Sequence, residues 1–185
     1  MFARFAATVM LLLTVSAPAW AAAQREDLQI FRDVSRQVLR YPQFTIFDSI
    51  NAQVDDGVVT LTGRVTMPYK RDAIAERIAR IDGVRELRNE VAVLPVSQFD
   101  DELRLRIARA IYGNSNFWTY GAMANPPIHI IVENGNITLT GLVNSQVEKA
   151  VLGSIARGTL AFRVDNQVQI ESELNKEPVK KPAAS

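Results

Sequence analysis

Two arginines and three aromatic residues lie close together in the second half of the chain. They are Arg106, Arg109, Phe117, Trp118 and Tyr120. The arginines fall on an expected helix, and the aromatics follow in a segment punctuated by glycine and proline. Aromatic rings favour the headgroup level of a membrane, and basic residues are attracted to anionic lipids. The pattern therefore predicts a patch that binds a phospholipid surface or another partner. The alternative is that Phe117 and Trp118 cap a small core.

The residue types needed for catalysis do not come together in this sequence. The chain has no cysteine and only one histidine, His129, so neither a zinc site nor a Ser-His-Asp arrangement can be assembled. Asp55 and Asp56 fall in an expected turn, and the acids from Asp100 to Glu102 suit the N-terminus of a helix. We therefore predict no catalytic, cofactor-binding or metal-binding residues, and no enzyme. We expect His129 to be a partly exposed strand residue.

A ten-residue segment occurs twice and shows that the chain is repetitive. Residues 54–63 and 132–141 align without a gap, with identical residues at six of the ten positions. Each segment has alternating apolar and polar residues on both sides of a short turn, Asp56-Gly57 or Asn134-Gly135. Such dipeptides between alternating runs are typical of a β-hairpin. The sequence therefore predicts two copies of one hairpin.

Apolar residues at helical spacing lie before and after each hairpin, and a last short strand follows. The residues that carry these patterns are Phe31, Val34, Val38, Ile74, Ile78, Ile81, Leu87, Val91 and Val93 in the first copy and Leu103, Ile107, Ile111, Val147, Val151, Ile155, Val164, Val168 and Ile170 in the second. We predict an α+β fold of two repeated α-β-β-α-β modules. Each should be a three-stranded mixed sheet with two helices packed on one face.

This element order and its turn motif resemble the BON domain, a family found in an osmotically induced periplasmic protein and in outer-membrane-associated lipoproteins. The resemblance rests on the x-x-Thr-Leu-Thr-Gly sequence after each turn and on the late Asn-x-Val strand at residues 89–91 and 166–168. It covers the chain from about Leu28 to Glu171. The family implies binding, mostly to phospholipid or other envelope surfaces, with chaperone-like roles for some members and no catalysis.

The predicted boundaries are a signal peptide at residues 1–23, BON domains at residues 25–95 and 98–172, and a disordered tail at residues 173–185. The apolar run near the N-terminus is about eleven residues long, whereas a membrane span needs about 20. We therefore expect cleavage near Ala21 to Ala23 and release into the periplasm. Without a cysteine, the chain also lacks the lipidation site of a lipoprotein.

Charge balance argues against a nucleic-acid partner. Removal of residues 1–23 takes away Arg4 and no acid, which lowers the 21 basic residues to 20, equal to the 20 acidic residues. A chain without net charge has no long-range field to attract nucleic acid. The expected function is that of a non-enzymatic envelope protein that binds an anionic phospholipid surface peripherally, without spanning the membrane. The alternative is a protein-binding, chaperone-like envelope stress factor.

Overall fold

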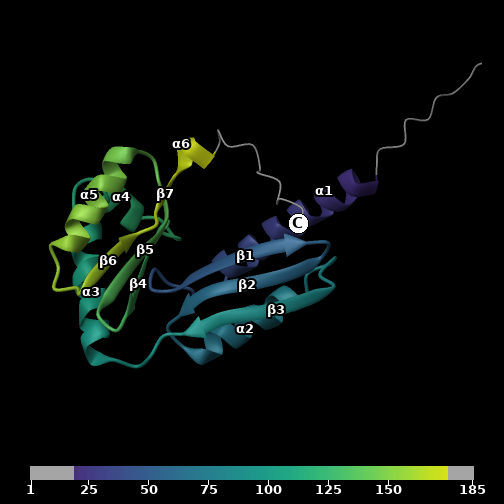
Figure 1. Cartoon of the computed structure of the whole chain (residues 1–185), viewed down its shortest axis with the longest axis horizontal. Coiled ribbons are helices and arrows are strands. Elements are labelled where there is room, and N and C mark those ends of the chain that lie inside the picture. Colours follow the sequence, from purple (N-terminus) through teal and green to yellow (C-terminus); the bar gives the residue numbers. More distant parts are fainter. Residues whose placement is uncertain (1–18, 175–185) are drawn as a thin grey trace, which may run out of the picture.

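A computed structural model describes residues 19–174, with the side chains of residues 26–173 (Figure 1). Most of the predicted signal peptide at residues 1–23 and of the predicted tail at residues 173–185 lies outside the described residues. The remainder contributes to the start of helix α1 (Ala19–Leu39) and the end of helix α6 (Glu171–Leu174). Both assignments therefore stay predictions.

The chain folds into two α-β-β-α-β modules, which confirms the predicted α+β class (Figure 1). After α1, the first repeat consists of β1 (Ser49–Asp55), β2 (Val58–Val65), α2 (Pro68–Ala79) and β3 (Glu86–Val93). The second repeat consists of α3 (Gln98–Tyr112), the short α4 (Trp118–Gly121), β4 (Ile128–Glu133), β5 (Asn136–Val143), α5 (Gln146–Arg157), β6 (Arg163–Asn166) and β7 (Gln169–Ile170).

The two sheets share one topology and one register. In each, the first two strands are antiparallel and the third runs parallel to the second. The first sheet has the predicted three strands, whereas the third strand of the second sheet is divided into β6 and β7, both paired with β5. Between them, the N–H of Val168 donates to the side chain of Asn166 at 3.4 Å. The equivalent bond, from the N–H of Val91 to the side chain of Asn89 at 3.2 Å, occurs in the first repeat, where β3 is continuous.

An aspartate on the first helix of each repeat holds the hairpin turn. The carboxylate of Asp27 accepts hydrogen bonds from the N–H groups of Asp56 and Gly57, at 3.0 and 2.9 Å. The carboxylate of Asp100 accepts the equivalent bonds in the second turn, at 2.9 and 2.7 Å. Each hairpin is thus anchored to a helix about thirty residues earlier. Asp100 is buried and does more than cap its helix.

The last glycine of the shared motif is required by a close backbone contact. A Cβ atom at Gly63 would lie 2.1 Å from the carbonyl oxygen of Ser49, and one at Gly141 would lie 1.8 Å from that of Pro127. Both glycines also have positive φ, at 123° and 107°. The motif therefore ends in glycine because its strand passes close to the backbone at the start of its hairpin partner.

In two helices the buried face is shifted from the predicted one, and one predicted residue of each is exposed. In α5 the buried residues include Leu152 and Ala156, while Val147 is exposed. In α1 the predicted Val34 and Val38 are buried together with Ile30, while the predicted Phe31 is exposed. Both helices remain amphipathic, but the apolar stripe is broader than the residues that the pattern selected. Packing against the sheet selects among them, and spacing alone does not.

The two repeats are packed against each other, and the first contributes to the core of the second. Ile46 and Phe47, from the loop before β1, pack on the second core. The N–H of Ile130 in β4 donates to the carbonyl of Ile46 at 2.7 Å. Side chains also meet across the junction, with Ser49 and Thr140 hydroxyls 3.1 Å apart. The loop before β1 thus links the two repeats.

Candidate binding surface of the second repeat

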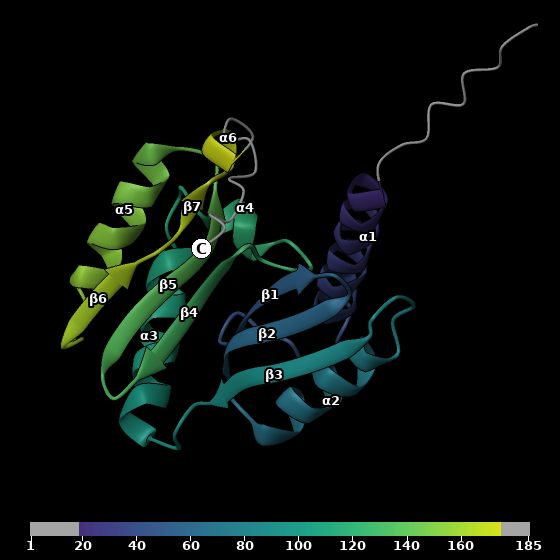
Figure 2. The same cartoon turned by 45° about the vertical axis from the view of Figure 1, so that its right-hand side comes forward.

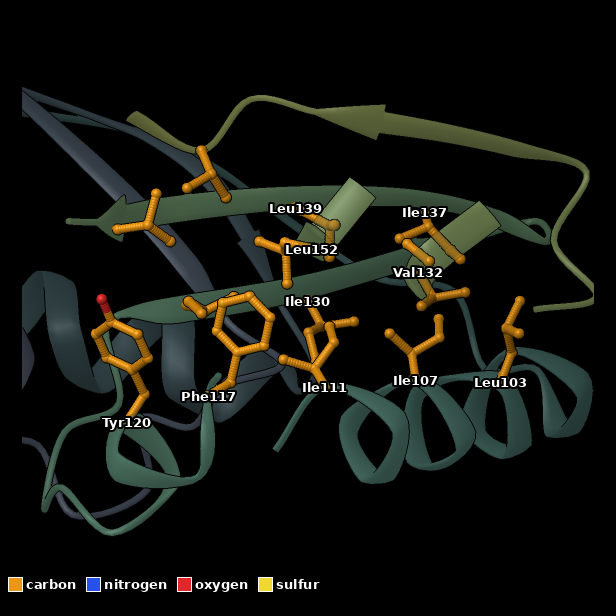
Figure 3. Packing of buried hydrophobic residues seen from close by; sticks show 14 of the residues in the cluster. Leu103, Ile107, Ile111, Phe117, Tyr120, Ile130, Val132, Ile137, Leu139 and Leu152 are labelled. Atoms are coloured by element: carbon orange, nitrogen blue, oxygen red, sulfur yellow. The ribbon is translucent and has the colours of Figure 1, made fainter. Parts of the chain in front are cut away.

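The aromatic segment forms a short, well-anchored helix. After α3 ends, the carbonyl of Asn114 accepts hydrogen bonds from the N–H groups of Phe117 and Trp118, at 2.9 and 3.1 Å. This turn leads into α4 and points the two neighbouring aromatic rings in different directions. Phe117 is fully buried in the second core, as Figure 3 shows, whereas the side chain of Trp118 is 63% exposed.

Tyr120 fixes the other end of α4. Its ring lies beside that of Phe117 (Figure 3), with the ring centroids 6.1 Å apart. Its hydroxyl donates to the carboxylate of Glu148 at 2.8 Å. The same carboxylate oxygen accepts the N–H of Asn144 at 2.8 Å. Burial and the Glu148 carboxylate raise the pKa of Tyr120 to about 12. The hydroxyl therefore stays protonated and acts as a donor at physiological pH.

The five predicted binding residues divide into two groups in the structure. Arg106, Arg109 and Trp118 are exposed, while Phe117 and Tyr120 are buried. The structural alternative, in which aromatics cap the core, thus describes Phe117 but leaves Trp118 at the surface. The exposed group lies on α3 and on the helical turn that follows it. The buried group holds that turn in place.

Arg104, on the same helix as the exposed arginines, has a structural role. Its guanidinium is buried, donates to the carbonyl of Val132 at 2.7 Å and pairs with Asp101. It is therefore not available to a headgroup. The basic part of the candidate surface consists of Arg106 and Arg109.

A second exposed aromatic group, which sequence reasoning missed, lies at the other end of the repeat. Phe99 and Phe162 stack with ring centroids 5.9 Å apart, and Phe162 is 79% exposed. Both rings lie beside the second hairpin turn, close to Gly135. In the repeat alignment Phe162 takes the place of Arg85, which pairs with Asp56 in the first repeat. The replacement of a charged residue, Arg85, by an aromatic one, Phe162, is the sequence feature that could have indicated this exposed group.

The buried charged residues of the first repeat are fully occupied by structural bonds. The carboxylate of Asp48 is buried and accepts hydrogen bonds from the backbone and hydroxyl groups of Thr45 and Thr66, at 2.8 to 2.9 Å. It also accepts from the ammonium of Lys70 at 2.7 Å. Burial alone would raise the pKa of Asp48, but Lys70 and these donors outweigh it and lower the pKa. This carboxylate stays ionised.

His129 lies between the two repeats and is half-buried, with its ring 5.3 Å from that of Phe44. Its Nδ1 atom is buried without a hydrogen-bond partner among the described residues. Burial lowers its pKa, although the Asp48 and Thr45 carbonyls and the Asp48 charge act in the opposite direction. The imidazole is therefore neutral at physiological pH. Within residues 19–174, no group of three potential metal ligands occurs.

Taken together, these features define a tandem α+β module whose second unit carries exposed aromatic and basic residues. The family model for the BON domain matches residues 26–95 and 100–172, and the chain belongs to the BON-domain family. BON domains form a non-catalytic binding family associated with phospholipid and with the cell envelope. None of the helices in the described part of the chain is long and apolar enough to cross a membrane.

Two solved structures with a distant likeness come from CdsD, a structural protein of the type III secretion system of Chlamydia trachomatis. The first, a C-terminal domain, has 16% sequence identity and a TM-score of 0.32, and the match covers 78% of this chain and 66% of that one. The second has 15% identity and a TM-score of 0.32, with 85% and 70% covered. These likenesses are too weak to support a functional argument. No curated protein matches the chain.

Proposed function

We propose that this protein is a non-enzymatic periplasmic envelope protein that binds anionic phospholipid surfaces through its second BON domain. The observation that carries the proposal is the exposed indole of Trp118 on a helical turn that buried Phe117 and Tyr120 hold in place. Arg106 and Arg109 are exposed on the preceding helix. Phe117 and Tyr120 then act by positioning the turn, and Trp118 and the arginines contact the lipid.

The physical contributions differ between the indole and the guanidinium groups. The indole partitions into the interfacial region of the bilayer, and this contribution depends little on salt. Each arginine near an anionic surface contributes about 1 kcal/mol, so the two together raise the affinity roughly thirtyfold at low salt. Because the turn is already ordered, binding does not have to offset the entropy of fixing it.

The proposal is tested by sedimentation of the mature protein with vesicles of phosphatidylcholine, with and without phosphatidylglycerol, over a salt series. We expect pelleting with the anionic vesicles at low salt and a marked loss with Trp118→Ala. The matched control is Tyr69→Ala, which removes an aromatic ring of similar exposure from the first repeat. Failure to pellet with anionic vesicles at low salt would refute the proposal, and equal effects of the two variants would place the site elsewhere.

The exposed pair Phe99 and Phe162 supports a second candidate function, a chaperone-like factor that binds protein. Stacked, solvent-exposed aromatic rings are typical of surfaces that bind apolar segments of a partner. The assay is suppression of aggregation of a chemically unfolded client at stoichiometric ratios. Phe162→Ala should abolish suppression while Trp118→Ala leaves it unchanged, and the reverse result would contradict a client site at Phe99 and Phe162.

A further inference from the structure

The two repeats differ in how the edge of their first strand is closed. β1 and β4 each pair with one neighbour in their sheet, and Figure 2 shows β1 at the edge of the first sheet. In an antiparallel pair, every second residue directs its N–H and C=O away from the partner strand. In β4 the outward-directed residues are Ile128, Ile130 and Val132, as their external hydrogen bonds show.

The edge of β4 is closed by three separate hydrogen bonds. The Tyr112 hydroxyl donates to the carbonyl of Ile128 at 2.6 Å, and the Arg104 guanidinium donates to that of Val132 at 2.7 Å. Between them, the Ile46 carbonyl accepts the N–H of Ile130 at 2.7 Å. A turn of the first repeat, at residues 45–48, thus occupies the middle of this edge, with one side chain of α3 on each side of it.

The edge of β1 has none of these closures. Its register with β2 matches that of β4 with β5, so Ile50, Ala52 and Val54 are the residues with outward backbone groups. Counted from the hairpin-anchoring aspartates, the positions of Arg104 and Tyr112 are taken in α1 by Phe31 and Leu39. Neither side chain can form a hydrogen bond. Among residues 26–173, no side chain or loop backbone group bonds to these outward groups.

An uncharged groove runs along the open edge. Four consecutive strand residues, 49–52, line a cavity of about 430 Å³, which shows that it follows the strand. Phe31 and Leu39 form one wall, and the second repeat forms the other with Pro127 and His129. None of its described lining residues is charged. Its apolar surface favours an apolar occupant, and it offers no cation for the phosphate of a lipid headgroup.

The occupied edge of β4 shows what fits such a site. There one backbone carbonyl of a turn accepts an outward N–H, and the side chains of that turn, Ile46 and Phe47, pack on the apolar core beneath the strand. Along β1 no such turn intervenes, so its outward backbone groups follow one another at strand spacing and suit an extended partner. We propose that the edge of β1 binds an extended, uncharged peptide segment of another protein, with bulky apolar residues, by β-strand addition. A second copy of this chain does not supply the segment from residues 45–47, because that segment is already buried on its own second repeat.

The direct test uses a labelled peptide with the sequence of residues 42–47, Pro-Gln-Phe-Thr-Ile-Phe, with both ends blocked. Binding to the mature protein is measured by fluorescence anisotropy, and hydrogen exchange then locates the site. We expect the amides of Ile50, Ala52 and Val54 to gain protection in the complex. No binding, or protection confined to other residues, would overturn the proposal. Protection of the same amides by lysophosphatidylcholine but not by the peptide would overturn it in favour of a lipid.

A double variant transfers the closure of the second repeat to the first. The substitutions Phe31→Arg and Leu39→Tyr give α1 the same residue types that Arg104 and Tyr112 supply in α3, so they can bond to the outward groups of β1. We expect peptide affinity to fall at least about tenfold. Leu105→Arg is the matched control, because Leu105 has an exposure similar to that of Leu39 but lies on α3. Wild-type affinity in the double variant would overturn the proposal.

A second variant keeps the test independent of that design. Ala52→Pro removes an outward N–H that β2 does not use, and proline is tolerated at such edge positions. The variant should keep its circular dichroism spectrum and lose peptide binding. A folded Ala52→Pro protein that binds the peptide as tightly as the wild type would contradict strand addition.

Discussion

The two repeats satisfy the same backbone group with different chemistry. In the first repeat the N–H of Thr66 donates to Asp48, whose charge is balanced by Lys70 on α2. In the second repeat the equivalent N–H, of Asn144, donates to Glu148 on α5. Glu148 takes the sequence position of Lys70. The acidic residue therefore lies in the loop before β1 in the first repeat and on the helix α5 in the second. Its partner is then a neutral donor, the hydroxyl of Tyr120.

The two repeats also differ in how completely their core side chains are buried. The longer loop of the second repeat supplies Phe117, which is fully buried. The side chains of Ile128, Ile130 and Val132 in β4 face the core and are buried as well. The equivalent residues of β1 are only half-buried, beside the open edge. Duplication of one fold has thus produced one closed module and one that keeps an accessible edge.

The largest effect is expected at the buried ion pair of the first repeat. Asp48→Ala leaves the ammonium of Lys70 buried without a counter-charge and removes the acceptor for Thr45 and Thr66. Breaking a buried pair costs about 3–5 kcal/mol. Urea unfolding of the mature protein should show this loss, whereas Asp33→Ala, in a surface pair with Arg36, should cost less than about 1 kcal/mol. Equal losses would mean that the buried pair is not needed for stability.

A slightly smaller loss is expected when the core of the second repeat is opened. Phe117→Ala removes a fully buried ring and should lower the free energy of unfolding by about 3 kcal/mol. Trp118→Ala, one residue along, removes an exposed ring and should change it by less than about 0.5 kcal/mol. Thermal or urea unfolding distinguishes the two variants. Comparable losses would show that the two rings are not divided between core and surface.

An intermediate effect is expected for the neutral counterpart of the ion pair. Tyr120→Phe keeps the ring and removes the hydroxyl that donates to Glu148, which should cost about 1–2 kcal/mol. The loss should be smaller than that for Asp48→Ala, since the Glu148 carboxylate keeps its bond from Asn144. A loss as large as that of Asp48→Ala in the same urea series would mean that the Tyr120–Glu148 bond contributes as much to stability as the Asp48–Lys70 ion pair.

The repeat, both hairpins and the helix order could be predicted because they depend on local patterns. Alternation and the Asp-Gly or Asn-Gly turns specify each hairpin within about ten residues. The contacts that distinguish the repeats link distant positions, such as Phe99 with Phe162 and Ile46 with Ile130, and no local pattern contains them. The aromatic loop was recognised, but the direction of each ring depends on the turn that Asn114 begins.

Stability should depend on pH through His129, which lies at the junction of the repeats. Its pKa is lowered by burial in the folded state, so the unfolded chain binds a proton first as the pH falls. Stability is then fully present above the ordinary pKa of about 6.5 and decreases as the pH falls through that value. His129→Gln should reduce this dependence in urea unfolding between pH 7.5 and 5.5. An unchanged slope would show that the histidine does not titrate differently on folding.

The smallest effect is expected for the ion pair between the repeats, in which Arg64 lies 3.2 Å from Glu133. Both side chains are about two-fifths exposed, at 42% and 39%, so water and salt screen the attraction. A double-mutant cycle of Arg64→Gln and Glu133→Gln should give a coupling energy of about 0.5 kcal/mol at low salt. It should fall towards zero in about 1 M salt, where the Debye length is about 3 Å. A coupling energy above about 2 kcal/mol that persists in salt would mean that this ion pair holds the two repeats together. The packing of Ile46 and Phe47 on the second core would then be less important.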